Sequence, residues 1–363
     1  MFLALREIRF ATGRFTLMGA VVALISLLLV MLSGLTAGLA NQNTSAIADL
    51  DAETLAFSTV DQQDASYTES QVSQDQLTVW QRSAGVESAE PLGITQTRAE
   101  PSGDSSGATS AAVFGVDPEG RLNPSAELAE GQTVISEDVA EQLDLSTGDA
   151  LILGGVELTV AEVRADQWYS HTPVVWATQQ DWSELARLSD PDAVGTVIAA
   201  THTPDADAQT VRDDVDPAAD TVSMSPRESF SALASFSSEN GALTMIQGLL
   251  YGISALVIIA FLTVWTVQRT RDIAVLKALG ATQGYVLRDA MVQALIVLAG
   301  GALVGGALGL GGGLFAAQAA PFDVSISTTL VPVAGVVLLG LGGAALAVRR
   351  TTKVDPLLAL GGS

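Results

Sequence analysis

Four long apolar runs, separated by polar segments, set the organisation of this 363-residue chain. They cover residues 15–40, 243–267, 290–318 and 328–348. A helix needs roughly 20 apolar residues to cross the hydrocarbon core of a bilayer, and backbone amides in lipid must form hydrogen bonds within their own segment. Each run is long enough, so the pattern predicts four transmembrane helices.

The positively charged residues flank these runs unevenly. Ten of the 17 lysines and arginines lie in three segments, which are residues 1–14, 268–289 and 349–363. Segments rich in Lys and Arg stay on the cytoplasmic side of a membrane. We therefore expect a multi-pass protein of the cell membrane with both termini in the cytoplasm. Residues 41–242 are then expected outside.

The two ends of the first apolar run each allow two interpretations. Residues 1–14 alternate apolar and basic positions, which predicts an amphipathic helix on the inner leaflet, although a charged flank that only orients the first span has the same pattern. Residues 38–40 (Gly-Leu-Ala) resemble a signal-peptidase site. The apolar run before them is much longer than the roughly 7–15 residues of a signal core, so an uncleaved anchor is favoured.

The segment 41–242 carries most of the negative charge. It holds 35 of the 40 acidic residues, with seven arginines and no lysine. This balance argues against nucleic acid as a partner. It fits a solvated surface or, alternatively, attraction of cationic substrates. The chain has no cysteine, so the segment must fold around its own apolar core.

The same segment reads as a small α+β domain. We expect a helix near residues 41–55 and another over 137–143, capped by Ser136. Gly154 and Gly155 predict a two-residue hairpin. Strands are expected at residues 111–116, 133–136, 150–153, 156–163 and 174–177. Residues 203–220 are acidic and read as turns.

Familiar catalytic motifs are missing. Lys277 is followed by Ala278 and Lys353 by Val354, so no phosphate-binding loop of the G-x-x-x-x-G-K-[ST] kind occurs. The patterns of zinc proteases, serine hydrolases and paired-cysteine metal sites do not occur either. His171 and His202 are the two histidines, both in the segment expected outside. For His171 a surface or half-buried position is favoured, and a ligand role is the alternative. We expect no enzymatic activity in this chain itself.

Two features suggest helix contacts. Residues 268–289 predict a short amphipathic helix that ends at Gly280 and seats in a groove of a partner protein. The third run carries glycines at every fourth position, a spacing that lets another helix approach closely. They are Gly301, Gly305, Gly309 and Gly313. They indicate either a mobile or oligomeric interface or packing within one four-helix bundle.

The loop after the second span resembles that of MacB/FtsX-type ABC permeases. Residues 269–282 (RTRDIAVLKALGAT) follow the pattern R-x-R-E-I-A-x-L-K-A-L-G-A-[ST], with Asp272 in place of Glu. The tail 349–360 and the segment 131–163 are also similar to that family. The resemblance implies an α-helical membrane protein with four transmembrane helices and an extracytoplasmic α+β domain.

The resemblance also implies partners. The chain is expected to form a homodimer in contact with membrane lipid and to bind two copies of a separate ATPase subunit, which holds the ATP. Force from ATP-driven closure would reach the permease through the short inner helix. The residues assigned to this coupling are Arg271, Asp272, Lys277, Ala278, Leu279 and Gly280.

Within that family the chain is similar to the DevC/HrtB-like branch, which includes heme exporters. Heme is then the expected cargo, and no intrinsic cofactor is expected. Heme needs an apolar slot and one or two axial ligands, and ionisable groups at the membrane edge are functional candidates. The candidates for iron ligation are Met31 and Glu239. Met245 and Tyr251 on the second span are further heme-binding candidates, and Phe230 and Phe236 are the candidates for the walls of the slot.

Other interpretations stay open at this point. Glu239 also fits a solvated acid at a helix start, Met31 also fits a core residue, and the two phenylalanines also fit interface anchors. As alternatives to heme export, the family implies export of lipid or antimicrobial peptide. It also implies an FtsX-like mechanotransmitter that acts on cell-wall hydrolases.

Overall fold

The computed structural model describes residues 12–59, 64–103, 107–186, 188, 190–268, 275 and 280–351. The chain divides into two compact units. One unit, called here the membrane unit, comprises residues 1–39 and 241–363, and the other, the outer domain, comprises residues 40–240. The expected amphipathic helix at residues 1–14, most of the inner loop and the tail after residue 351 lie outside the described residues or at their margin.

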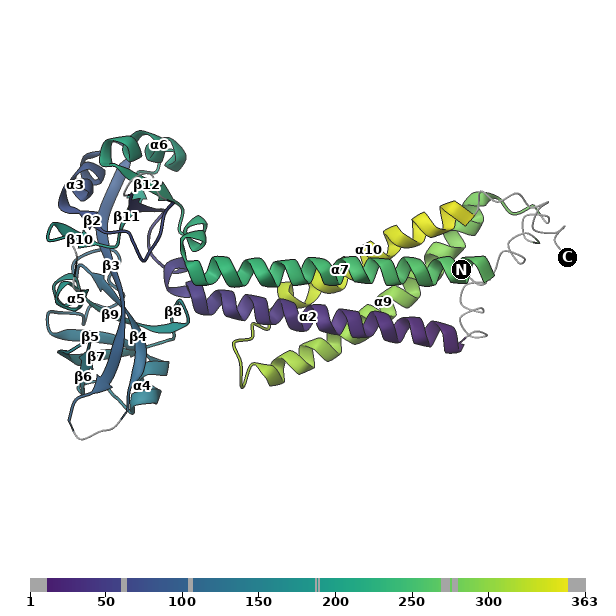
Figure 1. Ribbon diagram of the computed structural model, residues 1–363, viewed down its shortest axis with the longest axis horizontal. Coiled ribbons are helices and arrows are strands. Elements are labelled where there is room, and N and C mark those ends of the chain that lie inside the picture. Colours follow the sequence, from purple (N-terminus) through teal and green to yellow (C-terminus); the bar gives the residue numbers. More distant parts are fainter. Residues whose placement is uncertain are drawn as a thin grey trace. The chain divides into compact units, whose positions relative to one another are not determined.

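Four long apolar helices build the membrane unit (Figure 1). They are α2 (Thr12–Ala48), α7 (Ala234–Gln268), α9 (Gln283–Ala316) and α10 (Ile326–Thr351). All four are long and apolar enough to cross a membrane. The helices α2 and α7 have 37 and 35 residues and include residues of both units. At ~1.5 Å per residue, each exceeds the roughly 30 Å of a bilayer core.

The glycines of α9 pack inside the subunit. A Cβ atom on Gly301 would lie 2.7 Å from the carbonyl oxygen of Gly19 on α2, and a Cβ on Gly309 would lie 2.9 Å from Val30. Gly305 makes the closest approach of the repeat. These contacts favour packing within one bundle over an oligomeric interface for this stripe of glycines.

Large apolar side chains remain exposed on the same helices. On α7 they recur at three- and four-residue spacing, and they are Met245, Leu249, Ile253 and Leu256, each more than half exposed. Such a stripe on a soluble protein would be an aggregation site. On a spanning helix it is the surface that lipid or another membrane helix covers.

A mixed sheet of ten strands forms the framework of the outer domain, in the order β12-β1-β11-β3-β4-β9-β5-β7-β6, with β8 paired to β9. A second sheet pairs β2 with β10. The strands are β1 (Thr54–Ser58), β2 (Val72–Ser73), β3 (Val86–Pro101), β4 (Thr109–Val116), β5 (Gln132–Ser136), β6 (Ala150–Leu153), β7 (Val156–Arg164), β8 (Trp168–Tyr169), β9 (Thr172–Thr178), β10 (Ala193–Gly195), β11 (Val197–His202) and β12 (Thr221–Met224).

The long strand β3 joins two parts of this sheet. Its first half pairs with β11, its second half pairs with β4, and its last residues pair with β6. The β3–β6 pairing closes the strands β3, β4, β9, β5, β7 and β6, which lie in the outer domain of Figure 1, into a ring of pairings. Closure leaves these strands without an unpaired edge between them. The short helices are α3 (Gln74–Arg82), α4 (Glu137–Leu143), α5 (Gln179–Ala186), α6 (Ala208–Ala219) and the 3-10 helix η1 (Glu228–Ala232).

Several local predictions are confirmed. Gly154 and Gly155 form the two-residue loop between β6 and β7, with φ angles of 55° and 101°. Only glycine adopts two such angles in succession at little cost. Helix α4 covers residues 137–143 and has Ser136 at its N-cap, but the Ser136 side chain makes no capping hydrogen bond.

Helices α3, α5 and α6 are absent from the sequence prediction. Residues 203–220 do not form only turns, because α6 occupies 208–219. Its apolar residues Val211, Val215 and Ala219 recur every four positions and are buried, which outweighs the acidic composition. Helix α3 was not predicted. Ser73 and Gln76 form a reciprocal capping box at its start, and that pattern is visible in the sequence.

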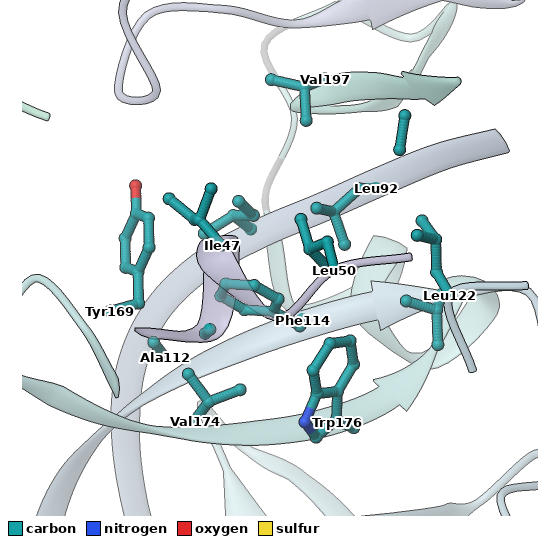
Figure 2. Packing of buried hydrophobic residues seen from close by; sticks show 14 of the residues in the cluster. Ile47, Leu50, Leu92, Ala112, Phe114, Leu122, Tyr169, Val174, Trp176 and Val197 are labelled. Atoms are coloured by element: carbon teal, nitrogen blue, oxygen red, sulfur yellow. The ribbon is translucent and has the colours of Figure 1, made fainter. Parts of the chain in front are cut away.

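Aromatic and aliphatic side chains fill the core beside the end of α2. Ile47 and Leu50 are buried against Phe114 and Trp176 of the sheet (Figure 2). The rings of Phe114 and Trp176 meet edge to face at 5.1 Å, and Tyr169 meets Phe114 in the same way at 5.6 Å. Burial raises the pKa of the Tyr169 phenol, so this group stays neutral. The core therefore fixes the strands that lead to the hairpin described next.

Candidate functional site

A polar cluster in the outer domain contains Glu239, the predicted ligand near the start of α7. The Nε2 atom of His171 lies 3.0 Å from Oε1 and 2.9 Å from Oε2 of Glu239. The Nδ2 atom of Asn43 donates to Oε2 over 3.2 Å. Three elements thus meet at one carboxylate, because Asn43 belongs to α2 and His171 lies between β8 and β9.

The hairpin that carries His171 has an unusual backbone. Ser170 and His171 form its two-residue loop, and their φ angles are 48° and 63°. The left-handed region costs a residue with a side chain about 1–2 kcal/mol, and Asn-Gly is the pair that such loops favour. Strain of this kind persists where surrounding contacts enforce it.

Contacts with α2 enforce this loop. The backbone N–H groups of Ser170 and His171 donate to the carbonyl oxygens of Asn43 and Gln42 over 3.0 and 2.9 Å. On β8, the strand that leads into the loop, the backbone N–H of Trp168 donates to Ser45 Oγ over 2.8 Å. The hairpin tip is therefore fixed to the end of α2 by main-chain hydrogen bonds, independently of the His171 side chain.

Two serines complete the cluster. Ser235 Oγ donates to Asn43 Oδ1 over 2.7 Å, and Ser170 Oγ lies 2.9 Å from Ser235 Oγ. Since Oδ1 of Asn43 accepts, its amide nitrogen is the donor toward Glu239. Since both Glu239 oxygens accept, the Nε2 atom of His171 carries a proton. Asn43 Nδ2 also lies 3.0 Å from His171 Nε2, so both nitrogens converge on the same carboxylate.

The Glu239–His171 pair remains open to solvent. The side chains are 39% and 32% exposed, so the carboxylate is reachable from outside the domain. Within the described residues, no group of three or more His, Asp or Glu side chains is arranged to hold a metal ion. The cluster is thus a carboxylate positioned by one imidazole and one amide.

The other predicted cargo residues lie in different surroundings. Phe230 and Phe236 meet edge to face at 5.6 Å and pack against the buried cluster of the outer domain. In the membrane unit, the sulfur of Met31 lies 3.3 Å from the position of a Cβ on Gly312 of α9. The ring of Tyr251 lies 3.0 Å from the place where a Cβ on Gly335 of α10 would stand. The side chain of Met245 is 64% exposed.

Most of the predicted coupling residues lie outside the described residues. These are Arg271, Asp272, Lys277, Ala278 and Leu279. Gly280 is described, and its φ of 95° is the left-handed conformation with which glycine commonly ends a helix.

Sequence reasoning missed Phe322, which lies in the segment between α9 and α10. Its ring reaches the positions where a Cβ on Gly34 of α2 or on Gly313 of α9 would stand, at 2.2 and 2.5 Å. The N–H of Asp323 donates to the carbonyl oxygen of Gly34 over 3.0 Å. The phenyl ring therefore fills a slot between two helices, one helical turn from Met31. The two glycines were visible in the sequence, but their partner was not.

A cavity of about 370 Å³ adjoins the end of α2 in the outer domain. Asp49, Asp51 and Asp166 line it together with Arg121 and Arg164. Arg121 is already paired with Asp51 at 3.3 Å and with Glu87 at 3.6 Å. The lining carries three acidic and two basic side chains, so its charge gives the cavity no preference for an anionic ligand.

The sequence matches two protein families that together cover most of the chain. Residues 15–218 match the MacB-like periplasmic core domain, and residues 244–356 match the FtsX-like permease C-terminal family. The chain belongs to the MacB/FtsX-type permeases of ABC transporters and is a multi-pass membrane protein. The predicted fold class is confirmed. In this family a separate ATPase typically hydrolyses the ATP, so the assignment implies an ATPase partner.

The chain is also similar to individual proteins and to solved structures. A Staphylococcus haemolyticus protein named hemin transport system permease protein HrtB is 24% identical over 364 residues, covering 100% of this chain and 99% of the relative. The macrolide export ATP-binding/permease protein MacB of Azoarcus sp. is 33% identical over 144 residues, covering 37% of this chain and 21% of MacB. The periplasmic region of MacB from Actinobacillus actinomycetemcomitans has a TM-score of 0.36 and 13% identity, covering 50% of this chain and 92% of that structure.

Proposed function

We propose that this chain is the permease subunit of an ABC-type exporter whose cargo is heme. The observation that carries the proposal is the Glu239 carboxylate, which is held by His171 and Asn43 on the helix that leads into the second apolar span. The full-length similarity to a protein named as a hemin transport permease supports the same cargo.

The chemistry of ferric heme fits such a group. Its iron takes axial ligands such as carboxylate oxygen, thioether sulfur or imidazole nitrogen, and its porphyrin ring is apolar. Glu239 would supply an anionic oxygen from the outer domain, and Met31 of the membrane unit stays a predicted thioether ligand. The exposed apolar residues of α7, among them Met245, would contact the ring. Heme is the substrate in this account and not a resident cofactor.

The proposed transport cycle uses energy from a partner. Two ATPase subunits close on ATP, and the inner loop with Arg271 and Lys277 passes the motion to α2 and α7. A slot between two copies of the chain narrows and expels heme that entered sideways from the outer leaflet. The chain itself makes or breaks no covalent bond, and both of its termini lie in the cytoplasm.

Open glycines on α7 support a dimer. Among the described residues, no atom beyond the neighbouring turns of α7 lies within 4 Å of a Cβ position on Gly248 or Gly252, and both glycines are exposed in the single subunit. Their G-x-x-x-G spacing allows close approach of a second helix. The four repeated glycines of α9, Gly301, Gly305, Gly309 and Gly313, are used inside the subunit, so α7 offers the better surface for a second copy.

Hemin titration of the full chain in lipid nanodiscs tests the proposed cargo. Wild-type protein should shift the Soret band of hemin, and the shift should saturate at a fixed ratio of hemin to protein. Glu239→Gln should weaken hemin binding by about 10-fold or more. Glu228→Gln is the matched control, because Glu228 is another acid close to α7 that bonds only with its own neighbours and with Arg212. An equal loss in both variants, or no saturable binding by the wild type, would contradict heme as the cargo.

Force transmission to a cell-wall hydrolase is the second candidate function. It is favoured by the length of α2 and α7, since each helix runs from an apolar span into the outer domain without a break. A transmitter needs a protein partner for the outer domain and no small cargo. Stimulation of ATP hydrolysis by hemin in the complex with its ATPase supports export and argues against this candidate.

A further inference from the structure

We infer that His171 is a positioning residue for the cargo ligand Glu239, and that the strained Ser170–His171 loop exists to present this imidazole. The inference rests on the proposed function. It goes beyond that function because neither the family assignment nor the relatives assign a role to His171. The histidine is one of only two in the chain.

The geometry around the carboxylate carries the first step. The His171 Nε2 atom lies within hydrogen-bonding distance of both Glu239 oxygens, and Asn43 donates to only one of them, Oε2. Oε1 therefore keeps a lone pair free of these donors, and the side chain is 39% exposed. A carboxylate that ligates a metal is usually oriented by hydrogen bonds to its outer atoms, and loss of such a partner typically weakens metal binding by about 10- to 100-fold.

The backbone carries the second step independently. The hairpin tip is attached to α2 through main-chain N–H groups, so its position does not need a histidine. The left-handed angles at both residues would suit Asn-Gly better. The Ser-His pair makes two side-chain contacts that an Asn-Gly loop would lack. The imidazole contacts Glu239, and the Ser170 hydroxyl contacts Ser235.

These two observations make the effect of His171 on fold stability distinguishable from its effect on hemin binding. Replacing the loop by Asn-Gly (Ser170→Asn with His171→Gly) should relieve the backbone strain and remove the imidazole. The apparent unfolding temperature of the full chain in nanodiscs should stay equal or rise. Hemin affinity should nevertheless fall about 10- to 100-fold. A histidine that only stabilises the fold would give the opposite result, a lower unfolding temperature.

Two further variants assign the effect to the hydrogen bond. His171→Ala should lose hemin affinity, and His171→Gln should recover part of it because a glutamine amide can still donate to Glu239. In a double-mutant cycle with Glu239→Gln, His171→Ala should have no additional effect on hemin affinity. Metal-free protoporphyrin is the ligand control, and its binding should not change in any variant, since it has no iron to ligate.

The outcomes distinguish the two proposals. If wild-type protein binds hemin, loss in the Asn-Gly and Ala variants with an unchanged response to metal-free protoporphyrin supports the role of His171. If wild-type protein binds hemin and both variants bind equally well, His171 has no positioning role, while heme export stands. If wild-type protein binds no hemin at all, both proposals are wrong.

Discussion

Gly305 of α9 and Ala23 of α2 lie in direct backbone contact. A Cβ atom on Gly305 would stand 2.0 Å from the carbonyl oxygen of Ala23, closer than any side chain allows. One turn away on either side, Gly301 faces the carbonyl oxygen of Gly19 at 2.7 Å and Gly309 faces the side chain of Val30 at 2.9 Å. The glycine repeat therefore sets the distance between the first and third membrane helices.

Replacing this glycine should separate the two helices. Gly305→Ala adds one methyl group against backbone atoms that cannot rotate away, and overpacking of this kind typically costs about 1–3 kcal/mol. The apparent unfolding temperature of the full chain in detergent should fall. Gly311→Ala on the same helix serves as the control, because within the described part of the chain its Cβ meets no atom of another element within 4 Å. Equal unfolding temperatures for the two variants would contradict the packing described here.

Trp182 makes a similar contact in the outer domain. Gly93 and Gly115 are partners across β3 and β4, and a Cβ on either would fall within 2.3 Å of Trp182 atoms. Gly93→Ala should therefore destabilise the domain by about 1–3 kcal/mol. Combining it with Trp182→Ala should cost less than the sum of the two single changes, because the double variant removes the clash. Additive losses in thermal unfolding would show that the two residues do not interact in this way.

His202 should make stability depend on pH. Burial lowers the pKa of this histidine below its ordinary value of 6.5, with smaller opposing and supporting effects from Glu53 and Arg212. Its ring atom Nε2 lies 2.8 Å from Thr54 Oγ1, and its backbone N–H donates to the carboxylate of Glu53. The unfolded chain therefore binds a proton at a higher pH than the folded chain does.

The sign of this effect follows directly. At a pH above the pKa of the unfolded state, the histidine is neutral in both states, and its contribution to the free energy of unfolding does not change with pH. As pH falls through about 6.5 toward the folded value, stability decreases by up to ~1.4 kcal/mol per pH unit, and below the folded value the decrease stops. Thermal unfolding of the wild type and His202→Gln between pH 8 and 5 measures it. The account requires the wild type to lose more stability than the variant on acidification.

Charge reversal in the inner loop tests the coupling assignment. Arg271→Glu with Lys277→Glu should abolish copurification of the ATPase subunit or uncouple its ATP hydrolysis from the permease. Arg227→Glu, an exposed arginine of the outer domain, is the matched control. Unchanged assembly and activity in the double variant would remove these two residues from the coupling role.

Local patterns in the sequence predict a large part of the fold. The four apolar runs, the Gly154–Gly155 hairpin and the helix at 137–143 each depend on neighbouring residues, and the structure confirms them. Helix α6 was missed because its buried stripe consists of only three small or branched residues within an acidic segment. Composition indicated turns there, whereas burial of one face decided the structure.

The candidate site was harder to predict for a different reason. Glu239 was selected from its place before the second span, but its partner His171 is 68 residues away and Asn43 is 196 residues away. Their meeting depends on the register of β8 and β9 and on the end of α2, which no local pattern specifies. Phe322 was missed for the same reason, since its contacts with Gly34 and Gly313 join three separate segments.

Hemin-dependent ATP hydrolysis by the permease in complex with its ATPase, reconstituted in nanodiscs, tests the central claim most directly. The account predicts that the permease alone hydrolyses no ATP, that hemin stimulates hydrolysis by the complex, and that Glu239→Gln abolishes this stimulation while Glu228→Gln retains it. Hydrolysis that is indifferent to hemin in the wild-type complex, or ATP turnover by the permease alone, would contradict it.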